Sequence, residues 1–276
     1  MSYRVESLCQ LLGVSRSGYY SWRKRPASRR EKANERLVSQ ISQIHRQSNE
    51  TYGSPRICDE LKEHGFRCSR NRVARLMRLH NLHAKTKRRF KVTTRSSHRL
   101  PLAPDLLHRD FRAQAPNRVW TSDITYVWTR EGWVYLAVVL DLYSRFIVGW
   151  EMSDRLTAEL VTTALERAID RRHPGADLVL HSDRGSQYAS EELRSLTQSH
   201  GMRLSMGATG SCYDNAVTES FFHTLKTEHT FFERYGTREE ARQSIFQYIE
   251  VFYNRQRRHS TNGNLSPWHY EHQNYP

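Results

Sequence analysis

The sequence predicts a mixed α/β sheet flanked by helices, preceded by an all-α module of the helix-turn-helix type. Three observations lead to this fold class. Residues 1–83 carry apolar side chains at helical spacing, residues 84–116 are basic and contain prolines, and residues 117–276 alternate β-rich runs with helices. We therefore expect a helical module (1–83), a basic linker (84–116) and an α/β core with a C-terminal helical tail (117–276).

The charge of the chain is concentrated near its start. The net charge is +14, of which residues 1–100 carry +17 and residues 101–276 carry −3. A basic segment beside a near-neutral one indicates a polyanion-binding module attached to another activity. The alternative is a surface that only keeps the protein in solution, because charge alone specifies no partner.

Cysteine usage and hydropathy exclude several classes of protein. The four cysteines, at positions 9, 58, 68 and 212, form no C-x-x-C pair, so neither a disulfide framework nor a thiolate zinc site is indicated. The longest apolar run, Trp133 to Leu140, is far shorter than the roughly 20 residues of a membrane helix, and the first residues lack the apolar stretch of a signal peptide. The sequence therefore predicts a cytoplasmic protein without a membrane partner.

Short helices are predicted over the first 83 residues. An apolar stripe runs from Val5 to Leu12, Gly13 interrupts it, and Ser15 can cap a second helix. This order favours a helix-turn-helix, with a generic helical hairpin as the alternative. Three further helices follow, in which Pro55 starts one helix, Gly65 can end it and Ser69 can cap the next. Their inward positions are Leu37, Ile41, Ile44, Ile57, Leu61, Val73, Leu76 and Met77.

Arginines recur every two or three residues on the last of these helices. They are Arg70, Arg72, Arg75 and Arg78. Arginines at this density suit phosphates or base edges in a major groove, so we expect this helix to contact DNA. A solvated charged face is the alternative.

A basic arm follows the helices. The stretch from Ala84 to Arg99 holds seven basic residues and no acidic one. We expect it to track a phosphate backbone and to be disordered when alone, or else to be a solvated linker. The DNA contacts predicted within it are Lys85, Lys87, Arg88 and Arg89.

Strands dominate after Pro116. Three β-rich runs are predicted at 118–129, 133–144 and 145–153, followed by a helix at about 157–172. A short strand at 178–183, a helix at 191–200 and a strand at 202–206 come next. A glycine-containing loop then leads to a last helix before the tail.

Three carboxylates stand at positions that such a fold can bring together. Asp123 lies inside the first strand, Asp183 ends the fourth, and Glu219 lies on the helix after the loop, with 59 and 35 residues between them. The spacing alone is weak evidence among 29 acidic residues. A carboxylate in a buried strand needs a partner or a cation, and hard oxygen ligands suit Mg²⁺ or Mn²⁺. Two such ions about 4 Å apart promote in-line displacement at phosphorus; the alternative for Asp123 is an N-cap or turn carboxylate.

The blocks around these carboxylates resemble a known family. HSDRGSQY, TESFFHTLKTE and YNRQRRHS are similar to the DDE transposases and retroviral integrases, and specifically to OrfB, the second-frame protein of two-frame bacterial insertion sequences. The resemblance covers nearly the whole chain. It implies a ribonuclease H-like core, two divalent metal ions, an upstream helical DNA-binding module, and a catalytic, metal-binding triad of Asp123, Asp183 and Glu219.

Two further residues follow from the same resemblance. Lys226 matches the family's basic residue after the glutamate; it lies about two helical turns from Glu219 and could hold a terminal phosphate, or be one more exposed lysine. Asn215 precedes Glu219 by four residues and is a DNA-contact candidate, with a loop or cap asparagine as the alternative.

The function implied is that of a DNA transposase, which cuts the ends of a mobile element and joins the 3′-OH to target DNA. No covalent intermediate and no ATP are required. The implied partners are the terminal repeats, target DNA, further copies of the chain and an upstream-frame (OrfA-like) protein or fusion, in the nucleoid-associated cytoplasm of a bacterium. The alternatives are a ribonuclease H-type nuclease that does not join, and a non-catalytic helix-turn-helix DNA-binding protein.

Four other polar residues lie outside the predicted site: two are assigned structural roles, and two depart from the expected pattern. We expect Asp141 to pair with an arginine such as Arg145, and His181 to be a hydrogen-bonded histidine at the end of a strand rather than a proton shuttle. Asn262 and Asn264 stand where the resemblance leads us to expect apolar residues, which questions how the tail packs.

Overall fold

The computed structural model describes residues 4–85, 102–107, 110, 112–207 and 216–275. It divides into two compact units. The helical unit comprises the residues up to Gln47 and from Gly53 to His83, and the sheet unit comprises Ser48–Tyr52 and the residues from Ala84 on. Across the described ranges, none of the helices has the length and hydropathy to cross a lipid bilayer.

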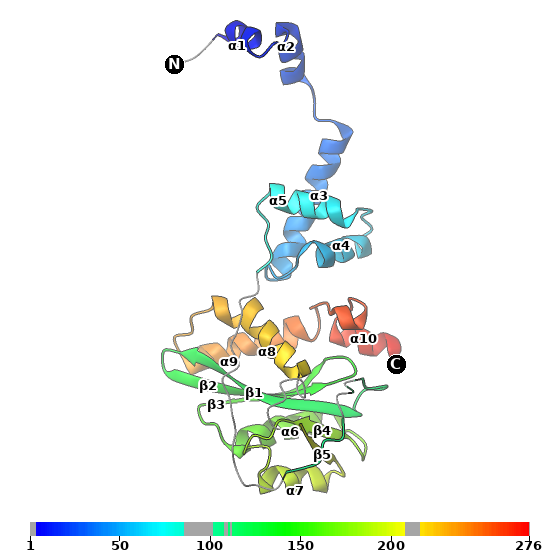
Figure 1. Cartoon of the computed structure of the whole chain (residues 1–276), viewed down its shortest axis with the longest axis vertical. Helices are drawn as coiled ribbons and strands as arrows, with labels where there is room; N and C mark the ends of the chain where they lie inside the picture. Colours follow the sequence, from blue (N-terminus) through cyan, green and yellow to red (C-terminus); the bar gives the residue numbers. More distant parts are fainter. Residues whose placement is uncertain (1–3, 86–101, 108–109, 111, 208–215, 276) are drawn as a thin grey trace. The chain divides into compact units, whose positions relative to one another are not determined.

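The helical unit contains five helices in its described residues. They are α1 (Val5–Leu11), α2 (Arg16–Lys24), α3 (Arg29–Gln47), α4 (Ser54–Glu63) and α5 (Arg70–Leu79) (Figure 1). The Oγ atoms of Ser15 and Ser69 accept the amide N–H groups of Gly18 and Arg72, at 3.0 and 3.3 Å, and so cap α2 and α5 as predicted. All eight of the predicted inward residues of α3, α4 and α5 are buried.

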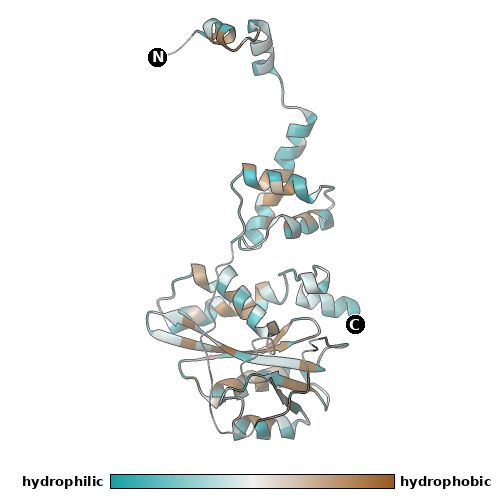
Figure 2. Cartoon of the chain, viewed as in Figure 1, coloured by the Kyte–Doolittle hydropathy of each residue, from teal (hydrophilic) through white to brown (hydrophobic). Residues whose placement is uncertain are grey.

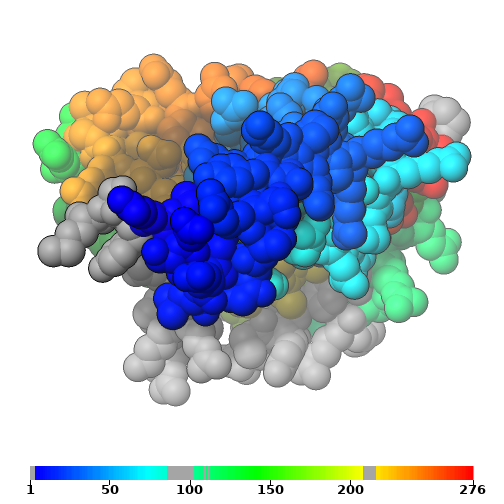
Figure 3. Space-filling view, turned by 90° about the horizontal axis from the view of Figure 1, so that it is seen from above, coloured from blue at the N-terminus to red at the C-terminus, as the bar shows by residue number. Residues whose placement is uncertain are grey.

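The apolar stripe of α1 forms a helix but is not buried within its own unit. Leu11 and Leu12 are 81% and 71% exposed, and Cys9 is the buried residue of α1. The atoms of α1 and α2 are dark blue in Figure 3. Two helices of this length cannot enclose a core of their own, because each offers only two turns of apolar surface.

The sheet unit is built on a five-stranded mixed sheet in the order β3-β2-β1-β4-β5. Its strands are β1 (Val119–Thr129), β2 (Gly132–Asp141), β3 (Ile147–Ser153), β4 (Val179–Ser182) and β5 (Arg203–Met206). The first three form an antiparallel meander, and β4 pairs in parallel with both β1 and β5. This is the mixed sheet predicted from the sequence.

Helices cover both faces of this sheet. On one face lie α6 (Ala158–Arg172) and α7 (Glu191–Ser199); on the other lie α8 (Ala216–Glu228) and α9 (Arg238–Phe246) (Figure 1). Hydrophobic residues concentrate along the strands and the helix faces beside them (Figure 2). The main core joins Trp120 and Val139 of the strands to Leu160 and Leu165 of α6.

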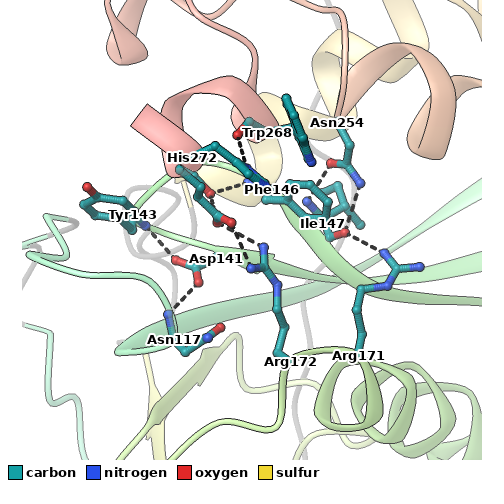
Figure 4. A network of polar contacts seen from close by, with 12 residues as sticks. Asn117, Asp141, Tyr143, Phe146, Ile147, Arg171, Arg172, Asn254, Trp268 and His272 are labelled. Atoms are coloured by element: carbon teal, nitrogen blue, oxygen red, sulfur yellow. Dashed lines mark hydrogen bonds and ion pairs between the residues drawn. The ribbon is translucent and has the colours of Figure 1, made fainter. Parts of the chain in front are cut away.

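The tail contains short elements tied down by buried polar groups. These elements are η1 (Thr230–Phe232), η2 (Gln247–Tyr253, a π-helical segment), η3 (Ser260–Asn262) and α10 (Pro267–Asn274). The Asn254 amide bonds both the N–H and the C=O of Ile147, and Arg172 of α6 forms a two-point ion pair with Glu271 of α10 (Figure 4). Asn262 is 2% exposed and donates to the carbonyl of Ser144 at 2.6 Å, so this asparagine anchors the tail where an apolar residue was expected.

Part of the predicted linker belongs to the sheet unit. The amide of Leu106 donates to Ser205 Oγ at 2.9 Å, and the Pro104 carbonyl accepts the amide of Met206 at 3.2 Å. Leu107 is buried. β5 is an edge strand, so residues 102–107 satisfy backbone and side-chain groups that would otherwise be open there.

Candidate active site

Two parallel strands bring Asp123 and Asp183 to neighbouring positions. β1 and β4 pair with Thr121 opposite His181, and each aspartate lies two residues further along its chain. Because paired parallel strands run in the same direction, the two aspartates lie at the same end of the β1–β4 pairing, although Asp123 is still inside β1. Asp183 directly follows the last residue of β4, and ligands of such sheets bind at the carboxyl ends of the strands.

A hydrogen bond between threonines joins α8 to this place. Thr218 Oγ1 donates to Thr121 Oγ1 at 2.7 Å, and both side chains are fully buried. Thr218 precedes Glu219, and Thr121 lies two residues before Asp123. The bond therefore holds the first turn of α8 against β1 and brings Glu219 toward the aspartates. The sequence analysis missed this pair because a threonine in an apolar helix carries no signal of its partner.

Both aspartates are oriented by local backbone groups. Asp123 Oδ1 accepts the amide of Ile124 at 2.7 Å, and Asp183 Oδ1 accepts the amide of Gly185 at 2.9 Å. A Cβ atom at position 185 would lie 3.0 Å from that Oδ1, so a larger residue in this turn would press on the Asp183 carboxylate. These bonds restrict each side chain to a small range of orientations.

The three carboxylates act on one another electrostatically. Burial raises the pKa of Asp123 well above its usual value, and the charges of Asp183 and Glu219 raise it further. Burial and the charge of Asp183 also raise the pKa of Glu219. Crowded carboxylates of this kind are stabilised by a nearby cation.

Lys226 is the cation that reaches this region from α8. Its charge lowers the pKa of Asp123, and burial lowers its own pKa. Its Nζ atom lies 4.8 Å from the centre of the Tyr126 ring. Lys226 is therefore held half-buried beside the carboxylates rather than extended into solvent.

The described side chains do not form a finished metal site. Nowhere in the described ranges do three His, Cys, Asp or Glu side chains converge closely enough to hold a metal ion. Asp183 and Glu219 are exposed, whereas Asp123 is half-buried. The charges of the three carboxylates thus affect one another's pKa values. Binding one ion between them requires their side chains to turn toward each other.

The polar groups behind the carboxylates are internally bonded. Tyr188, in the HSDRGSQY block, is buried with its hydroxyl 3.0 Å from Ser122 Oγ, and Ser122 also donates to the carbonyl of Val138. His181 Nδ1 lies 2.9 Å from the buried Ser205 Oγ. His181 is therefore the hydrogen-bonded strand histidine that was predicted, and Tyr188 supports the site in a way not predicted.

Asp141 does not pair with Arg145 as expected. Its carboxylate accepts the amides of Asn117 and Tyr143, at 2.7 and 2.8 Å (Figure 4). It also accepts the indole N–H of Trp120. The Nη1 atom of Arg145 is buried without a hydrogen-bond partner in the described structure. The carboxylate is satisfied by the Tyr143 amide in the turn after β2 and by donors that precede or belong to β1.

The predicted DNA contacts are placed as follows. Arg70, Arg75 and Arg78 are exposed on α5. Arg72 instead donates to Asn34 Oδ1 through Nε and Nη2, at 3.0 and 2.7 Å, and so links α5 to α3. Lys85 lies over the Phe232 ring, with its Nζ 5.0 Å from the centroid. Lys87, Arg88, Arg89 and Asn215 lie outside the described residues.

Comparison with known proteins matches both parts of the chain. Family models for the integrase core domain match residues 113–212 and 219–275, and a model of the HTH-like domain matches residues 32–90. An uncharacterized 31 kDa protein of insertion element IS600 from Shigella sonnei is 48% identical over 94% of this chain and 96% of its own length. Transposase InsF for insertion sequence IS3A from Escherichia coli K12 is 43% identical over 99% of this chain and 95% of its own.

A solved viral structure is similar to this chain at a lower sequence identity. One chain of the simian T-cell lymphotropic virus intasome, in complex with PP2A regulatory subunit B56 gamma, is 16% identical with a TM-score of 0.49, over 84% of this chain and 74% of that chain. The relatives from insertion elements match at much higher identity and over nearly their full length. This chain therefore belongs to the family of insertion-sequence DNA transposases built on an integrase core domain.

Proposed function

We propose that Asp123, Asp183 and Glu219 are the catalytic residues with which this transposase cuts DNA at the ends of its element and joins the 3′-OH to target DNA. The observation that supports this assignment is that the inner strands β1 and β4 and the helix α8 carry the three carboxylates into one region of the sheet unit. There the charge of Asp183 acts on both other carboxylates, with Lys226 beside them. A catalytic site for phosphoryl transfer needs this combination of anionic ligands and a phosphate-binding cation.

The donor set fits divalent metal ions. Three carboxylates are hard oxygen ligands of the kind that Mg²⁺ and Mn²⁺ prefer, and their mutual repulsion is relieved by bound positive charge. Asp123, Asp183 and Glu219 would hold two ions, with Glu219 completing the second site. When bound, such ions activate the attacking oxygen and stabilise the departing one.

Two displacements at phosphorus make up the reaction. In the first, a water oxygen bonds to phosphorus, the bond to the 3′ oxygen breaks, and that oxygen takes up a proton to leave a 3′-OH. In the second, this 3′-OH loses its proton as its oxygen bonds to a target phosphorus and one target P–O bond breaks. The number of phosphodiester bonds is conserved in the second step, so no ATP is needed.

The remaining residues serve DNA binding in this proposal. Lys226 holds a phosphate beside the carboxylates, and Arg70, Arg75 and Arg78 bind the DNA backbone or base edges. Arg72 positions α5 against α3, and its DNA contact is secondary to that bond. Lys85, Lys87, Arg88, Arg89 and Asn215 complete the proposed set.

The proposed partners are DNA, further copies of this chain and an upstream-frame (OrfA-like) protein. An integrase core that must engage two element ends and one target is suited to work as an oligomer on DNA. The proposed location is the bacterial cytoplasm, in association with the nucleoid. An upstream-frame protein would add DNA-binding surface to the helical unit.

A cutting and joining assay tests the catalytic residues. Labelled DNA with the ends of the element that encodes this chain is incubated with Mg²⁺ or Mn²⁺ and the native chain, Asp123→Asn or Glu219→Gln. Matched controls are Asp170→Asn and Glu192→Gln, which change exposed carboxylates on α6 and α7. We expect both site variants to lose cutting and joining while they keep DNA binding, and both controls to retain all three.

The same assay separates the alternatives. Cutting without joining would identify a ribonuclease H-type nuclease. Cutting that survives both site substitutions would refute the triad. Binding without cutting, even after an upstream-frame protein is added, would leave a non-catalytic DNA-binding protein.

A further inference from the structure

An aromatic pocket is lined on one side by Lys226, and its aromatic residues have no part in the reaction described above. Its volume is about 680 Å³, within the range of pockets that hold a small ligand. It lies between the tip of the β1–β2 hairpin and the segment around η1. The lining residues that matter here are Tyr126, Trp128, Trp133, Phe231, Arg130 and Arg234.

Three aromatic rings form a continuous surface on the hairpin. Trp133 contacts Trp128 across the strands and Tyr126 diagonally, with ring centroids 4.8 and 5.0 Å apart, and both contacts are edge-to-face. Trp128 is 58% exposed and Trp133 is 45% exposed. Large aromatic side chains left exposed side by side mark a surface that binds something flat and apolar.

The charges around these rings select an anion. Lys226, Arg130 and Arg234 line the pocket, against one acidic side chain, Glu233. Lys226 Nζ lies over the ring of Tyr126, so a cation and an aromatic face are already side by side. A ligand that carries a flat ring and a negative charge complements both features, and a nucleotide has both.

The pocket is within reach of the carboxylates along one strand. Tyr126 follows Asp123 by three residues in β1, which corresponds to about 10 Å of extended chain, and side chains at this spacing start from opposite faces of a strand. That distance equals about three nucleotides of a stacked DNA strand. Lys226 connects the two places, because it lies over Tyr126 and its charge also acts on Asp123.

We infer that this pocket binds the base of an unpaired nucleotide in the DNA strand whose phosphodiester lies at the carboxylates. The base stacks on Trp133 and Trp128, and the adjoining phosphates contact Lys226 and Arg130. This inference rests on the proposed function, because it takes the carboxylates as the place of chemistry. A base can use these rings only after it has left its own stack, so the pocket favours unpaired or frayed DNA ends over intact duplex.

Affinity for single-stranded DNA tests the pocket. The probes are a fluorescein-labelled oligo(dT) of fifteen nucleotides and the same strand annealed to oligo(dA), titrated with the full chain. Trp133→Ala is expected to weaken oligo(dT) binding about 10-fold, since base–aromatic stacking contributes on that scale, and to leave duplex binding unchanged. Trp133→Phe keeps an aromatic face and is expected to restore most of the affinity.

The control is Trp268→Ala, which removes a tryptophan on α10, 36% exposed and stacked on His272. It is expected to leave both affinities unchanged. Thermal melting by circular dichroism checks that each variant is folded. Oligo(dT) with one 5-iodouracil, irradiated with the full chain, is expected to cross-link to Tyr126, Trp128 or Trp133 in peptide mapping.

Two results would overturn the inference. One is oligo(dT) affinity that is equal in the native chain and in folded Trp133→Ala and Trp128→Ala variants. The other is a change in oligomeric mass of these variants with unchanged DNA affinity, which would make the aromatic surface a contact between copies. The two hypotheses fail separately when oligo(dT) binding is measured in EDTA: loss of cutting in Asp123→Asn concerns the carboxylates, and loss of oligo(dT) affinity in Trp133→Ala concerns the pocket.

Discussion

The helical unit and the sheet unit place their charged residues in opposite ways. On α5, Arg70, Arg75 and Arg78 are exposed, with no neighbouring carboxylate needed to hold them. In the sheet unit, Asp123 is half-buried beside Asp183, and burial together with that charge raises its pKa. The helical unit spreads its charged side chains in solvent, whereas the sheet unit gathers three like charges at one place, of which that of Asp123 is half-buried.

The proposed function accounts for this difference. Binding a polyanion requires only that cations reach the phosphates, and exposed arginines do so at little structural cost. Chemistry at one phosphodiester requires charges held together in a region of low dielectric, where their effects are stronger. Such charges must be held by neighbouring structure, which the sheet provides and a small helical unit cannot.

Removal of divalent metal should have the largest effect of these tests, because it should abolish the activity of the sheet unit and leave DNA binding by the helical unit. With EDTA in place of Mg²⁺, we expect cutting and joining to fall at least about 1,000-fold, because metal ions supply several kcal/mol of transition-state stabilisation. DNA binding through exposed arginines should persist. The measurement is cleavage of labelled element ends, with a gel-shift assay at the same ionic strength. Cutting that continues in EDTA would contradict the metal-dependent site.

Breaking the ion pair between Glu228 and Arg257 measures how strongly the stability of the sheet unit depends on pairing its buried charges. Their side chains are 13% and 7% exposed, and Arg257 Nε and Nη2 both donate to Glu228 at 2.6 Å. Glu228→Gln should lower the free energy of unfolding by about 3 kcal/mol, because it leaves Arg257 buried without its counter-charge.

The matched control for that change lies in the helical unit. Glu6 pairs with Arg16, and their side chains are 57% and 59% exposed. Glu6→Gln should therefore change the stability of the chain by less than about 1 kcal/mol. Urea denaturation of both variants measures the difference. Equal losses would show that burial does not distinguish the two pairs.

Gly149 tests how closely the sheet unit is packed. A Cβ atom at this position would overlap the carbonyl oxygen of Ala164 and lie 2.7 Å from Cβ and N of Ala168. Gly149→Ala should lower the free energy of unfolding by about 2 kcal/mol, because α6 must move away from β3. Gly175→Ala is the control, since a Cβ there meets no atom within 4 Å. A Gly149→Ala variant as stable as this control would contradict the tight contact.

The exposed arginines of α5 should have the smallest individual effects. Arg75→Ala and Arg78→Ala are each expected to weaken DNA binding a few-fold and to lower the salt dependence by about one counterion. Arg72→Ala should instead lower the melting temperature, because it breaks the bonds to Asn34. Fluorescence titrations from 50 to about 200 mM salt, with melting curves, separate the two outcomes. A larger loss of DNA affinity for Arg72→Ala without loss of stability would reverse these roles.

Several features of the site could be predicted from the sequence, because they depend on local signals. Asp123 stood inside a strand pattern and Asp183 at the end of another, in the block HSDRGSQY, and the structure describes both in those places. The caps Ser15 and Ser69 likewise act within three residues of themselves. Their roles as catalytic ligands stay a prediction that the cutting assay tests.

Other features depended on contacts that no local pattern reveals. Arg72 carried the same signal as its three arginine neighbours, yet it bonds Asn34, 38 residues away in the chain. Asp141 was expected to pair with Arg145 and instead accepts backbone amides and an indole N–H. In both cases the partner is decided by which donor or acceptor the fold brings within about 3 Å.

The sequence alone determined the order of the elements and the excess of positive charge near its start, since both depend on residue type and short-range spacing. Its resemblance to a known family singled out the three carboxylates as candidates. Only the tertiary structure decided that β1 pairs with β4, that Thr218 binds Thr121, and that Tyr126, Trp128 and Trp133 form a pocket beside Lys226. These features join residues tens of positions apart. They depend on strand order and helix packing, which are set by burial of the whole core rather than by any one segment.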